Sequence, residues 1–182
     1  RHIYDVQQAE GRASAEKIKL PYNTTAISTG FDTSLLVDFH EVLKFSAPVT
    51  VKKVSPMVLN PGNLMITDAR IYYQPASINN VDEMVQSIDL RKIQRMYCRR
   101  YLLRPIGIEL VMTDGVSWLF CFDDKSIRDH IYSVINEFPH VNKAYVSLEQ
   151  YTSKWQRKEI SNFEYLMHLN YEADRSANDI AQ

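Results

Sequence analysis

The chain has no long apolar run and no leader-like start. None of its apolar stretches approaches the roughly 18 residues that a membrane-spanning helix needs. Its first residues lack the basic-then-apolar pattern of a signal peptide, and the chain starts with Arg1 rather than with methionine. We therefore expect a piece of a longer chain.

Cysteine is scarce, and neither cysteine nor histidine forms a recognisable site. The two cysteines, Cys98 and Cys121, give no disulfide framework and no zinc spacing, so we interpret them as reduced thiols in a cytosolic protein. No two histidines stand four residues apart, as they would on the metal-binding face of a helix. We expect a packing role for His130 and a structural hydrogen bond for His168.

The chain also lacks the motifs of common enzymes. There is no Gly-x-Ser-x-Gly elbow and no glycine-rich phosphate loop. A lipid hydrolase would need a nucleophile–base pair or a metal cluster, and the sequence supplies neither. We predict no enzyme, no catalytic residue, no metal and no cofactor.

Charge of one sign does not dominate the chain. Its 21 basic and 22 acidic side chains nearly cancel, so overall charge favours neither nucleic acid nor an anionic membrane as a partner. The hydrophobic fraction of 45% is ordinary for a globular protein. Only a local charged patch could recruit such partners.

What the chain does have is a series of short β-branched and aromatic runs separated by turn residues. This pattern predicts about seven antiparallel strands in a barrel or sandwich. The turn between the first two strands is placed at 59–62, where a proline precedes a glycine. Trp118 is expected in the core. The predicted strands cover residues 49–54, 63–67, 71–74, 84–88, 93–99, 106–112 and 117–122.

One amphipathic helix follows the strands. Apolar side chains recur at helical spacing from Ile127 to Phe138, and Asp123 or Asp124 can cap the start. Arg128 is assigned to the outward face with Asp129, Ser133 and Glu137. Seven strands and a closing helix are typical of a pleckstrin-homology (PH) fold, so the predicted class is α+β, mainly β: a PH-like seven-stranded antiparallel barrel or sandwich capped by a C-terminal helix.

Two shorter helices are expected near the end of the chain. Capping-box patterns start at Ser147 and at Ser161. Their aromatic faces cannot be buried against each other alone, so we predict a partner beyond Gln182. The candidate anchors toward that partner are Trp155, Phe163 and Leu166.

The run from Trp155 to Asn170, continued by 173–179, resembles the opening of a BEACH domain. The preceding part resembles the PH-like domain found before BEACH domains. The runs that carry this second resemblance are Asn60-Pro61-Gly62, Ile66-Thr67-Asp68, Ile71-Tyr72-Tyr73-Gln74-Pro75, Tyr97-Cys98-Arg99-Arg100 and Pro105-Ile106-Gly107-Ile108-Glu109.

The resemblance implies three regions and a cellular role. Residues 1–30 would be a linker or poorly ordered segment, 31–142 a PH-like domain, and 143–182 the first helices of a truncated BEACH domain. The implied protein is a cytoplasmic, non-catalytic scaffold in vesicle trafficking or receptor-linked sphingolipid signalling. Its PH-like domain would dock on the remainder of its own BEACH domain, with further protein partners.

A basic cluster is the one candidate surface in the PH-like part. Strand alternation places Ile93, Arg95, Tyr97 and Arg99 on one face. Such a face could be solvated, could dock protein, or could bind an anionic lipid headgroup. Lipid binding is the weaker alternative, because the predicted first loop, 59–63, carries no lysine or arginine. The candidate docking surface comprises Arg91, Arg95, Tyr97, Arg99, Arg100 and Arg104.

Overall fold

The computed structural model describes residues 31, 33–76, 84–141 and 146–180. The linker expected at 1–30 and the domain boundary expected at 142–143 lie outside the described residues. The described elements are, in order, η1 (Thr33–Leu35), β1 (Val49–Ser55), β2 (Val58–Ile66), β3 (Arg70–Pro75), β4 (Gln86–Asp89), η2 (Leu90–Lys92), β5 (Ile93–Tyr101), β6 (Arg104–Met112), β7 (Ser117–Cys121), α1 (Lys125–Asn136), α2 (Leu148–Gln156) and α3 (Asn162–Glu172).

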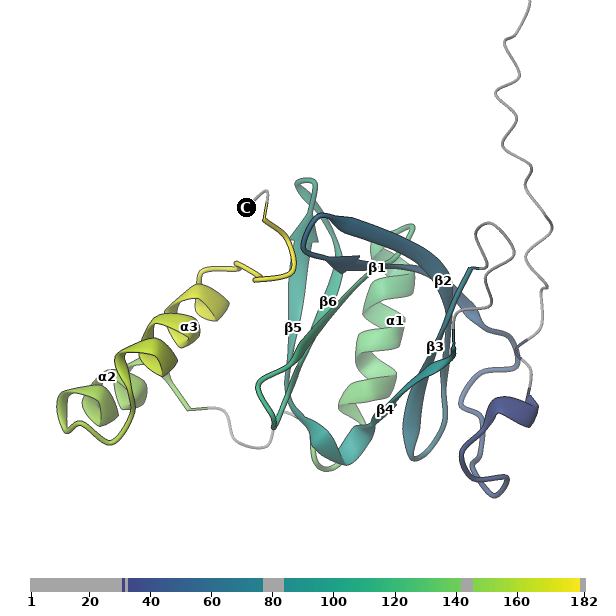
Figure 1. Ribbon diagram of the computed structural model, residues 1–182, viewed down its shortest axis with the longest axis horizontal. Helices are drawn as coiled ribbons and strands as arrows, with labels where there is room; N and C mark the ends of the chain where they lie inside the picture. The colour runs from purple at the N-terminus through teal and green to yellow at the C-terminus, as the bar shows by residue number, and fades with distance from the viewer. Residues whose placement is uncertain (1–30, 32, 77–83, 142–145, 181–182) are drawn as a thin grey trace, which may run out of the picture.

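The seven strands form one antiparallel sheet in the order β4-β3-β2-β1-β7-β6-β5. The sheet curls so that its two halves lie on either side of α1, while α2 and α3 lie apart, beside β5 (Figure 1). The predicted fold class, a mainly β PH-like sheet closed by a C-terminal helix, is confirmed.

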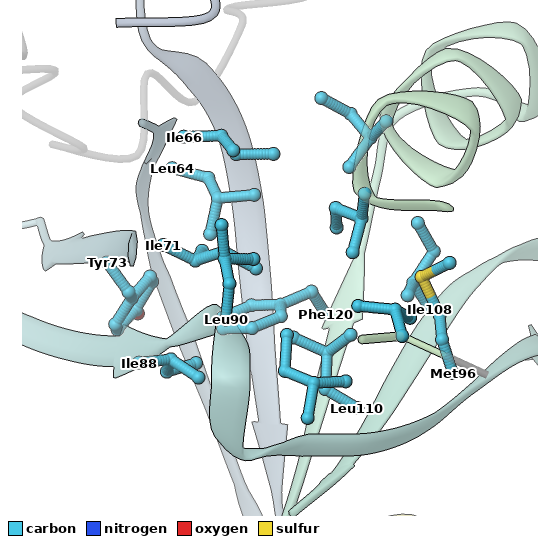
Figure 2. Close-up of a cluster of buried hydrophobic side chains, with 14 of the residues drawn as sticks. Leu64, Ile66, Ile71, Tyr73, Ile88, Leu90, Met96, Ile108, Leu110 and Phe120 are labelled. Atoms are coloured by element: carbon cyan, nitrogen blue, oxygen red, sulfur yellow. The ribbon is translucent and has the colours of Figure 1, made fainter. Parts of the chain in front are cut away.

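The core fills the space between the curled sheet and α1. Leu64, Ile71, Ile108, Leu110 and Phe120 point into it from four strands (Figure 2). Two isoleucines of α1 complete the cluster from the helix side. Burial of this apolar surface is the main force that closes the sheet.

Trp118 lies at the margin of this core instead of inside it. The side chain is only partly buried, and its ring stacks on Phe120 with centroids 6.1 Å apart. Lys53 Nζ lies 3.9 Å from the centroid of the indole ring, so a cation covers the indole. The prediction of a core position was therefore too simple.

Helix α1 corrects one predicted orientation. The Asp124 side chain caps the helix by accepting from the Ile127 amide. Arg128, expected to face solvent, is buried. It stands three residues before Ile131 and therefore shares the buried stripe of the helix, where its Nε lies 2.7 Å from Asp129 Oδ1.

The first hairpin turn is not where the Pro-Gly pair predicted it. Strand β2 already starts at Val58, so Pro56 and Met57 form the two-residue turn, with Met57 at a φ of 65°. Gly62 is needed inside the strand because a Cβ there would lie 2.6 Å from the ring of Tyr73. The true turn also lacks lysine and arginine, so that part of the argument against a headgroup site holds.

A bulge near the start of β5 corrects the predicted face. Ile93 pairs with Met112 and Arg95 with Val111, so Gln94 is an extra residue on β5. The bulge puts Ile93 on the core face, whereas Arg95 faces outward. Strict alternation had grouped the two together.

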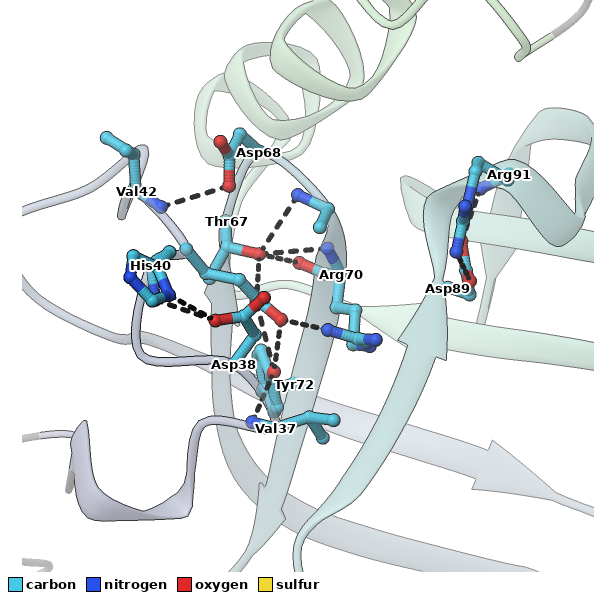
Figure 3. A network of polar contacts seen from close by, with 12 residues as sticks. Val37, Asp38, His40, Val42, Thr67, Asp68, Arg70, Tyr72, Asp89 and Arg91 are labelled. Atoms are coloured by element: carbon cyan, nitrogen blue, oxygen red, sulfur yellow. Dashed lines mark hydrogen bonds and ion pairs between the residues drawn. The ribbon is translucent and has the colours of Figure 1, made fainter.

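A segment before β1 lies against the outer side of β2 and β3. We call residues 37–44 the N-terminal strap. Its Glu41 carboxylate accepts from Thr67 Oγ1 (2.6 Å) and Tyr72 Oη (3.0 Å) and pairs with Arg70. The Val37 amide also donates to Tyr72 Oη, as Figure 3 shows.

Candidate functional site: an arginine-rich docking face

The outer side of β5 and β6 carries a set of buried polar side chains. We call Arg95, Tyr97 and Arg99 of β5, with Glu109 of β6, the docking face. Arg95, Arg99 and Glu109 are all more than nine-tenths buried, although none belongs to the apolar core. Charged groups are rarely buried unless they are paired, so the partners of these three decide what the face does.

Arg99 lies at the centre of the docking face. Its Nε donates to Glu109 Oε2 over 2.7 Å, and both side chains are almost completely buried. Its Nη1 donates to the carbonyl oxygen of Tyr171, also over 2.7 Å, at the end of α3. A charge-assisted bond to that carbonyl joins the sheet to the helix.

Aromatic rings enclose the same guanidinium. Arg99 Cζ lies 4.5 Å from the ring centroid of Tyr97 and 5.8 Å from that of Tyr171, and the two tyrosines stack with centroids 5.5 Å apart. Burial raises the pKa of both tyrosines, so they are neutral phenols at neutral pH. Both rings therefore attract the guanidinium by cation–π interaction, the Tyr97 ring from the shorter distance.

Gly107 allows Arg99 to approach β6 closely. Arg99 and Gly107 are directly opposite in the β5–β6 pairing. A Cβ at Gly107 would lie 3.1 Å from Arg99 Cβ and from its carbonyl oxygen. The glycine therefore leaves room for the arginine to lie over the sheet toward Glu109.

Arg95 makes a second set of contacts to the helices. Its Nη1 lies 3.1 Å from His168 Nδ1 on α3, and its Nη2 donates to Tyr151 Oη on α2 at 3.1 Å. The His168 and Tyr151 rings stack with centroids 3.6 Å apart. Since arginine can only donate, His168 Nδ1 accepts, and a neutral imidazole carries its proton on Nε2.

The electrostatics favour the neutral form of His168. Burial lowers the pKa of His168, and the neighbouring Arg95 cation lowers it further. The His168 Nε2 atom is 4.0 Å from Glu172 Oε1 and has no hydrogen-bond partner among the described residues. The expected structural hydrogen bond of His168 is therefore present on Nδ1.

The chain after α3 continues across the outer side of the sheet. We call residues 173–180 the C-terminal segment. Its Ser176 hydroxyl donates to Glu109 Oε1 at 2.6 Å, and Asn178 Nδ2 donates to Ser117 Oγ at 2.7 Å. Glu109 thus binds Arg99 with one oxygen and Ser176 with the other.

A small apolar cluster lies on the same side of the sheet. It consists of Val54, Leu119 and Cys121, with Tyr101 against it. Burial raises the pKa of the Cys121 thiol to about 12, so the thiol is protonated and unreactive at neutral pH. Cys121 therefore packs as a free, buried thiol, whereas Cys98 is free and exposed.

Helices α2 and α3 bury part of their aromatic surface on each other, contrary to expectation. Trp155 stacks on Tyr165 with centroids 4.8 Å apart, and its Nε1 donates to Asn162 Oδ1 at 2.7 Å. The predicted anchor Trp155 thus contacts Tyr165 and Asn162 but remains 38% exposed, and its role as an anchor stays a prediction. Phe163 and Leu166 are exposed, 71% and 56%.

The structure divides the predicted docking residues into two groups. Arg95, Tyr97 and Arg99 contact α2 and α3, and Arg100 Nε pairs with Asp174 Oδ2 of the C-terminal segment at 2.9 Å. The other two residues contact different parts of the chain. Arg91 pairs with Asp89, and Arg104 donates to the Asp123 carbonyl.

This arrangement removes Arg95 and Arg99 from the lipid alternative, which stays a prediction for the exposed arginines of the cluster, Arg91, Arg100 and Arg104. Arg95 and Arg99 are covered by the helices, so a headgroup cannot reach them while the helices are docked. Sequence reasoning also missed Glu109, His168 and Ser176 as members of the site. A lone acid within the apolar run of β6 was the available signal for Glu109.

No group of three or more metal-ligating side chains was found among the residues that the structure describes. Within the same part of the chain, no helix is long and apolar enough to cross a membrane.

Comparison with known proteins gave matches to both halves of the chain. Residues 51–136 match the family described as "PH domain associated with Beige/BEACH", and residues 153–182 match the Beige/BEACH domain. The human lysosomal-trafficking regulator is 30% identical over 144 residues, which is 71% of this chain but only 4% of that protein.

Solved structures gave weaker similarities. The C-terminal PH domain of human pleckstrin has a TM-score of 0.44 at 12% identity, covering 65% of this chain and 97% of that one. The N-terminal PH domain of human ARAP2 has a TM-score of 0.41 at 14% identity, covering 55% and 87%. From the wording of its matching runs, the sequence also predicts a closer resemblance to one BEACH protein, the factor associated with neutral sphingomyelinase activation, and this stays a prediction.

Proposed function

We propose that the chain is a non-catalytic protein-interaction module of a BEACH-domain protein. The two family matches and the human relative support its place in such a protein. In it the PH-like sheet holds the first BEACH helices through the docking face. The two parts then act as one rigid body that presents a joint surface to protein partners. The intact protein would be a cytoplasmic scaffold in membrane trafficking.

The observation that carries this proposal is the bonding of Arg99. A buried cation that binds Glu109 on the sheet and the Tyr171 carbonyl on the helix has a fixed geometry. Separating the helices from the sheet would return that carbonyl and the tyrosine rings to water and leave a buried ion pair partly open. A flexible tether would not need such contacts.

Hydrogen–deuterium exchange on the 182-residue chain tests the docking directly. We expect the α3 amides to be protected in the unmodified chain. Tyr171→Ala removes the ring that covers Arg99 from the helix side, without touching the sheet, and should raise exchange in α3 by tenfold or more, for a loss of about 1.4 kcal/mol. The strands β1–β4 should keep their protection.

Matched charge changes make the test specific. Arg99→Glu should release α3, whereas Arg91→Glu and Arg104→Glu make the same charge change outside the docking face and should leave it protected. The proposal is wrong if α3 exchanges freely in the unmodified chain. It is equally wrong if Arg91→Glu and Arg99→Glu have the same effect.

The exposed side chains of α3 extend the proposal to the rest of the BEACH domain. Phe163 and Leu166 are large, apolar and exposed, so we infer that they contact that part. In a longer chain that contains it, Phe163→Ser with Leu166→Ser should weaken the assembly. Unchanged thermal stability of the longer chain would rule this contact out.

The trafficking role needs a cellular test. In cells that lack the intact protein, re-expression of the unmodified form should restore the size and position of endosomes and lysosomes. The Arg99→Met form should fail and Arg91→Met should succeed. If the two forms rescue equally well, the docking face is not needed for the cellular function.

A further inference from the structure

Two hairpin turns of the sheet place bulky apolar side chains at positions that favour glycine or asparagine. Tyr101 pairs with Arg104, so Leu102 and Leu103 form a two-residue turn, with φ of 48° and 64°. Positive φ at both central residues defines a type I′ turn, whose preferred sequence is Asn-Gly. Met57 has a φ of 65° after Pro56, the position where a type II turn prefers glycine.

The same three side chains are among the most exposed apolar groups of the described residues. Leu103 is 92% exposed, Met57 87% and Leu102 69%. Each therefore combines a strained backbone with an apolar side chain in water, and packing within the described chain compensates for neither. Strain that local packing does not explain is a pointer to function.

The two turns lie near each other. Met57 and Ile180 line one hollow, and Leu102 and Leu103 line a neighbouring hollow of about 510 Å³; Asp179 borders both. The two hairpin ends and the end of the C-terminal segment lie toward the same side of the molecule in Figure 1. Together they form one apolar, projecting surface, which we call the hairpin tips.

Exposed cations surround the leucine turn. Arg100 and Arg175 line the hollow beside Leu103, and Lys52 and Arg104 line the hollow on the other side of Leu102. Arg100 is paired with Asp174, so these two charges offset each other, and Asp179 is buried. The remaining charges that line the two hollows are Lys52, Arg104 and Arg175, against one exposed acid, Asp123. The surroundings of the turn therefore favour an anionic partner.

We propose that the hairpin tips insert into the surface of an anionic membrane. Projecting aliphatic side chains can enter a soft acyl layer, whereas a rigid protein partner would need a matching hollow for each one. The basic side chains at the foot of the leucine turn would then reach the headgroups. This contact is separate from the docking face, which stays covered by α2 and α3.

Vesicle sedimentation with the 182-residue chain tests the proposal. The unmodified chain should bind vesicles of equal parts phosphatidylcholine and phosphatidylserine, and should bind pure phosphatidylcholine less. Added salt should weaken the binding to the anionic vesicles. The double variant Leu102→Asn with Leu103→Gly should reduce partitioning about tenfold or more, because two leucines leave the membrane.

The same double variant shows whether the two leucines serve membrane binding or the stability of the fold. Asn-Gly suits a type I′ turn, so the melting temperature should rise by about 2–4 °C while vesicle binding falls. Met57→Gly should behave in the same way, with a smaller loss of binding. Met84→Gly is the matched control: Met84 is 86% exposed but lies outside both hollows and before the edge strand β4, and its loss should not change binding.

Several outcomes would overturn the proposal. One is that the unmodified chain fails to bind vesicles at all, and another is that the Asn-Gly variant binds them as well as the unmodified chain does. A Met84→Gly variant that loses as much vesicle binding as the Asn-Gly variant would also contradict it. A fall in the melting temperature of the Asn-Gly variant would show that the leucines serve packing. Self-association of the chain through the tips, without vesicle binding, would assign the surface to a protein contact.

Discussion

The outer surface of β2 and β3 binds the N-terminal strap, and the outer surface of β5 and β6 binds the C-terminal helices. Both contacts use an arginine, an acid and a tyrosine, but the acid comes from the bound segment in the first and from the sheet in the second. On β2 and β3, the N-terminal strap supplies the acid, Glu41, while the sheet supplies Arg70 and Tyr72. On β5 and β6, the sheet supplies both the acid and the arginine, Glu109 and Arg99. To this pair the docked helices add a carbonyl and aromatic rings, and the C-terminal segment adds the Ser176 hydroxyl and a second acid, Asp174, which pairs with Arg100.

This difference predicts how each side behaves when its segment leaves. Release of the strap separates Glu41 from Arg70, and both charges can return to water. Release of the helices leaves Arg99 and Glu109 paired on the sheet. The buried pair of the docking face is therefore preformed, and the separate charge that docking brings to it, Asp174, is a partly exposed one.

The largest effect should come from Arg99→Met. It leaves Glu109 buried without its cation, and breaking a buried ion pair from one side costs about 3–5 kcal/mol. Urea unfolding measures the loss. A double variant, Arg99→Met with Glu109→Met, should recover most of the free energy of unfolding, since no charge is left buried. Additive losses in the double variant would contradict a preformed pair.

Glu41→Gln should cost less, about 1–3 kcal/mol. Its partner Arg70 is already partly exposed and can be rehydrated, with a side-chain accessibility of 23%. The control is Asp38→Asn, an exposed acid in the same strap, which should change the free energy of unfolding little. If Glu41→Gln lowers the free energy of unfolding as much as Arg99→Met does, the strap contact and the docking face do not differ in the way proposed.

Ser176→Ala should cost about 1 kcal/mol, because Glu109 loses one of its two bonded partners but keeps Arg99. The loss should appear first as faster amide exchange in the C-terminal segment. Ser133→Ala, on the exposed face of α1, is a control that should leave that segment protected. An unchanged exchange rate in Ser176→Ala would show that the hydroxyl contributes nothing to docking.

The smallest effect should be the pH dependence of docking. The pKa of His168 is lowered in the docked state, first by burial and then by Arg95. Above about 6.5, the ordinary histidine value, the imidazole is neutral in both states and docking is at full strength. As the pH falls below that value the undocked form gains protons first, so docking weakens until the lowered pKa is passed.

Near-ultraviolet circular dichroism of the stacked tyrosines can follow this change. His168→Gln should remove the pH dependence, and His140→Gln, at an exposed position, should keep it. A profile that is unchanged in His168→Gln would assign the titration to another group. It would also show that the Arg95–His168 contact does not make docking sensitive to acid.

Sequence patterns predicted the fold well where a residue's role is local. Strand runs, the α1 cap at Asp124 and both later capping boxes depend on neighbours a few residues away, and all are present. The patterns failed where a distant residue decides. The Pro61-Gly62 pair resembles a turn, but it lies inside β2 because Tyr73 of β3 needs the space above Gly62.

The candidate site divides in the same way. The sequence predicted a basic strand with an interleaved tyrosine. It could not decide whether that strand is solvated, docks protein or binds a lipid headgroup. The choice depended on which segment covers the strand, and Tyr151 and His168, the residues that cover Arg95, lie 56 and 73 positions further along the chain. Glu109, His168 and Ser176 contribute through contacts that no local pattern encodes.

By itself, the sequence determined the alternation of strands, the closing helix and the resemblance of its two halves to PH and BEACH domains. These follow from periodicity, turn chemistry and long matching runs. The tertiary structure decided which charges are buried, where Gln94 shifts the face of β5, and that the arginines face helices instead of solvent. Burial and pairing depend on distance in space, and spacing along the chain does not encode that distance.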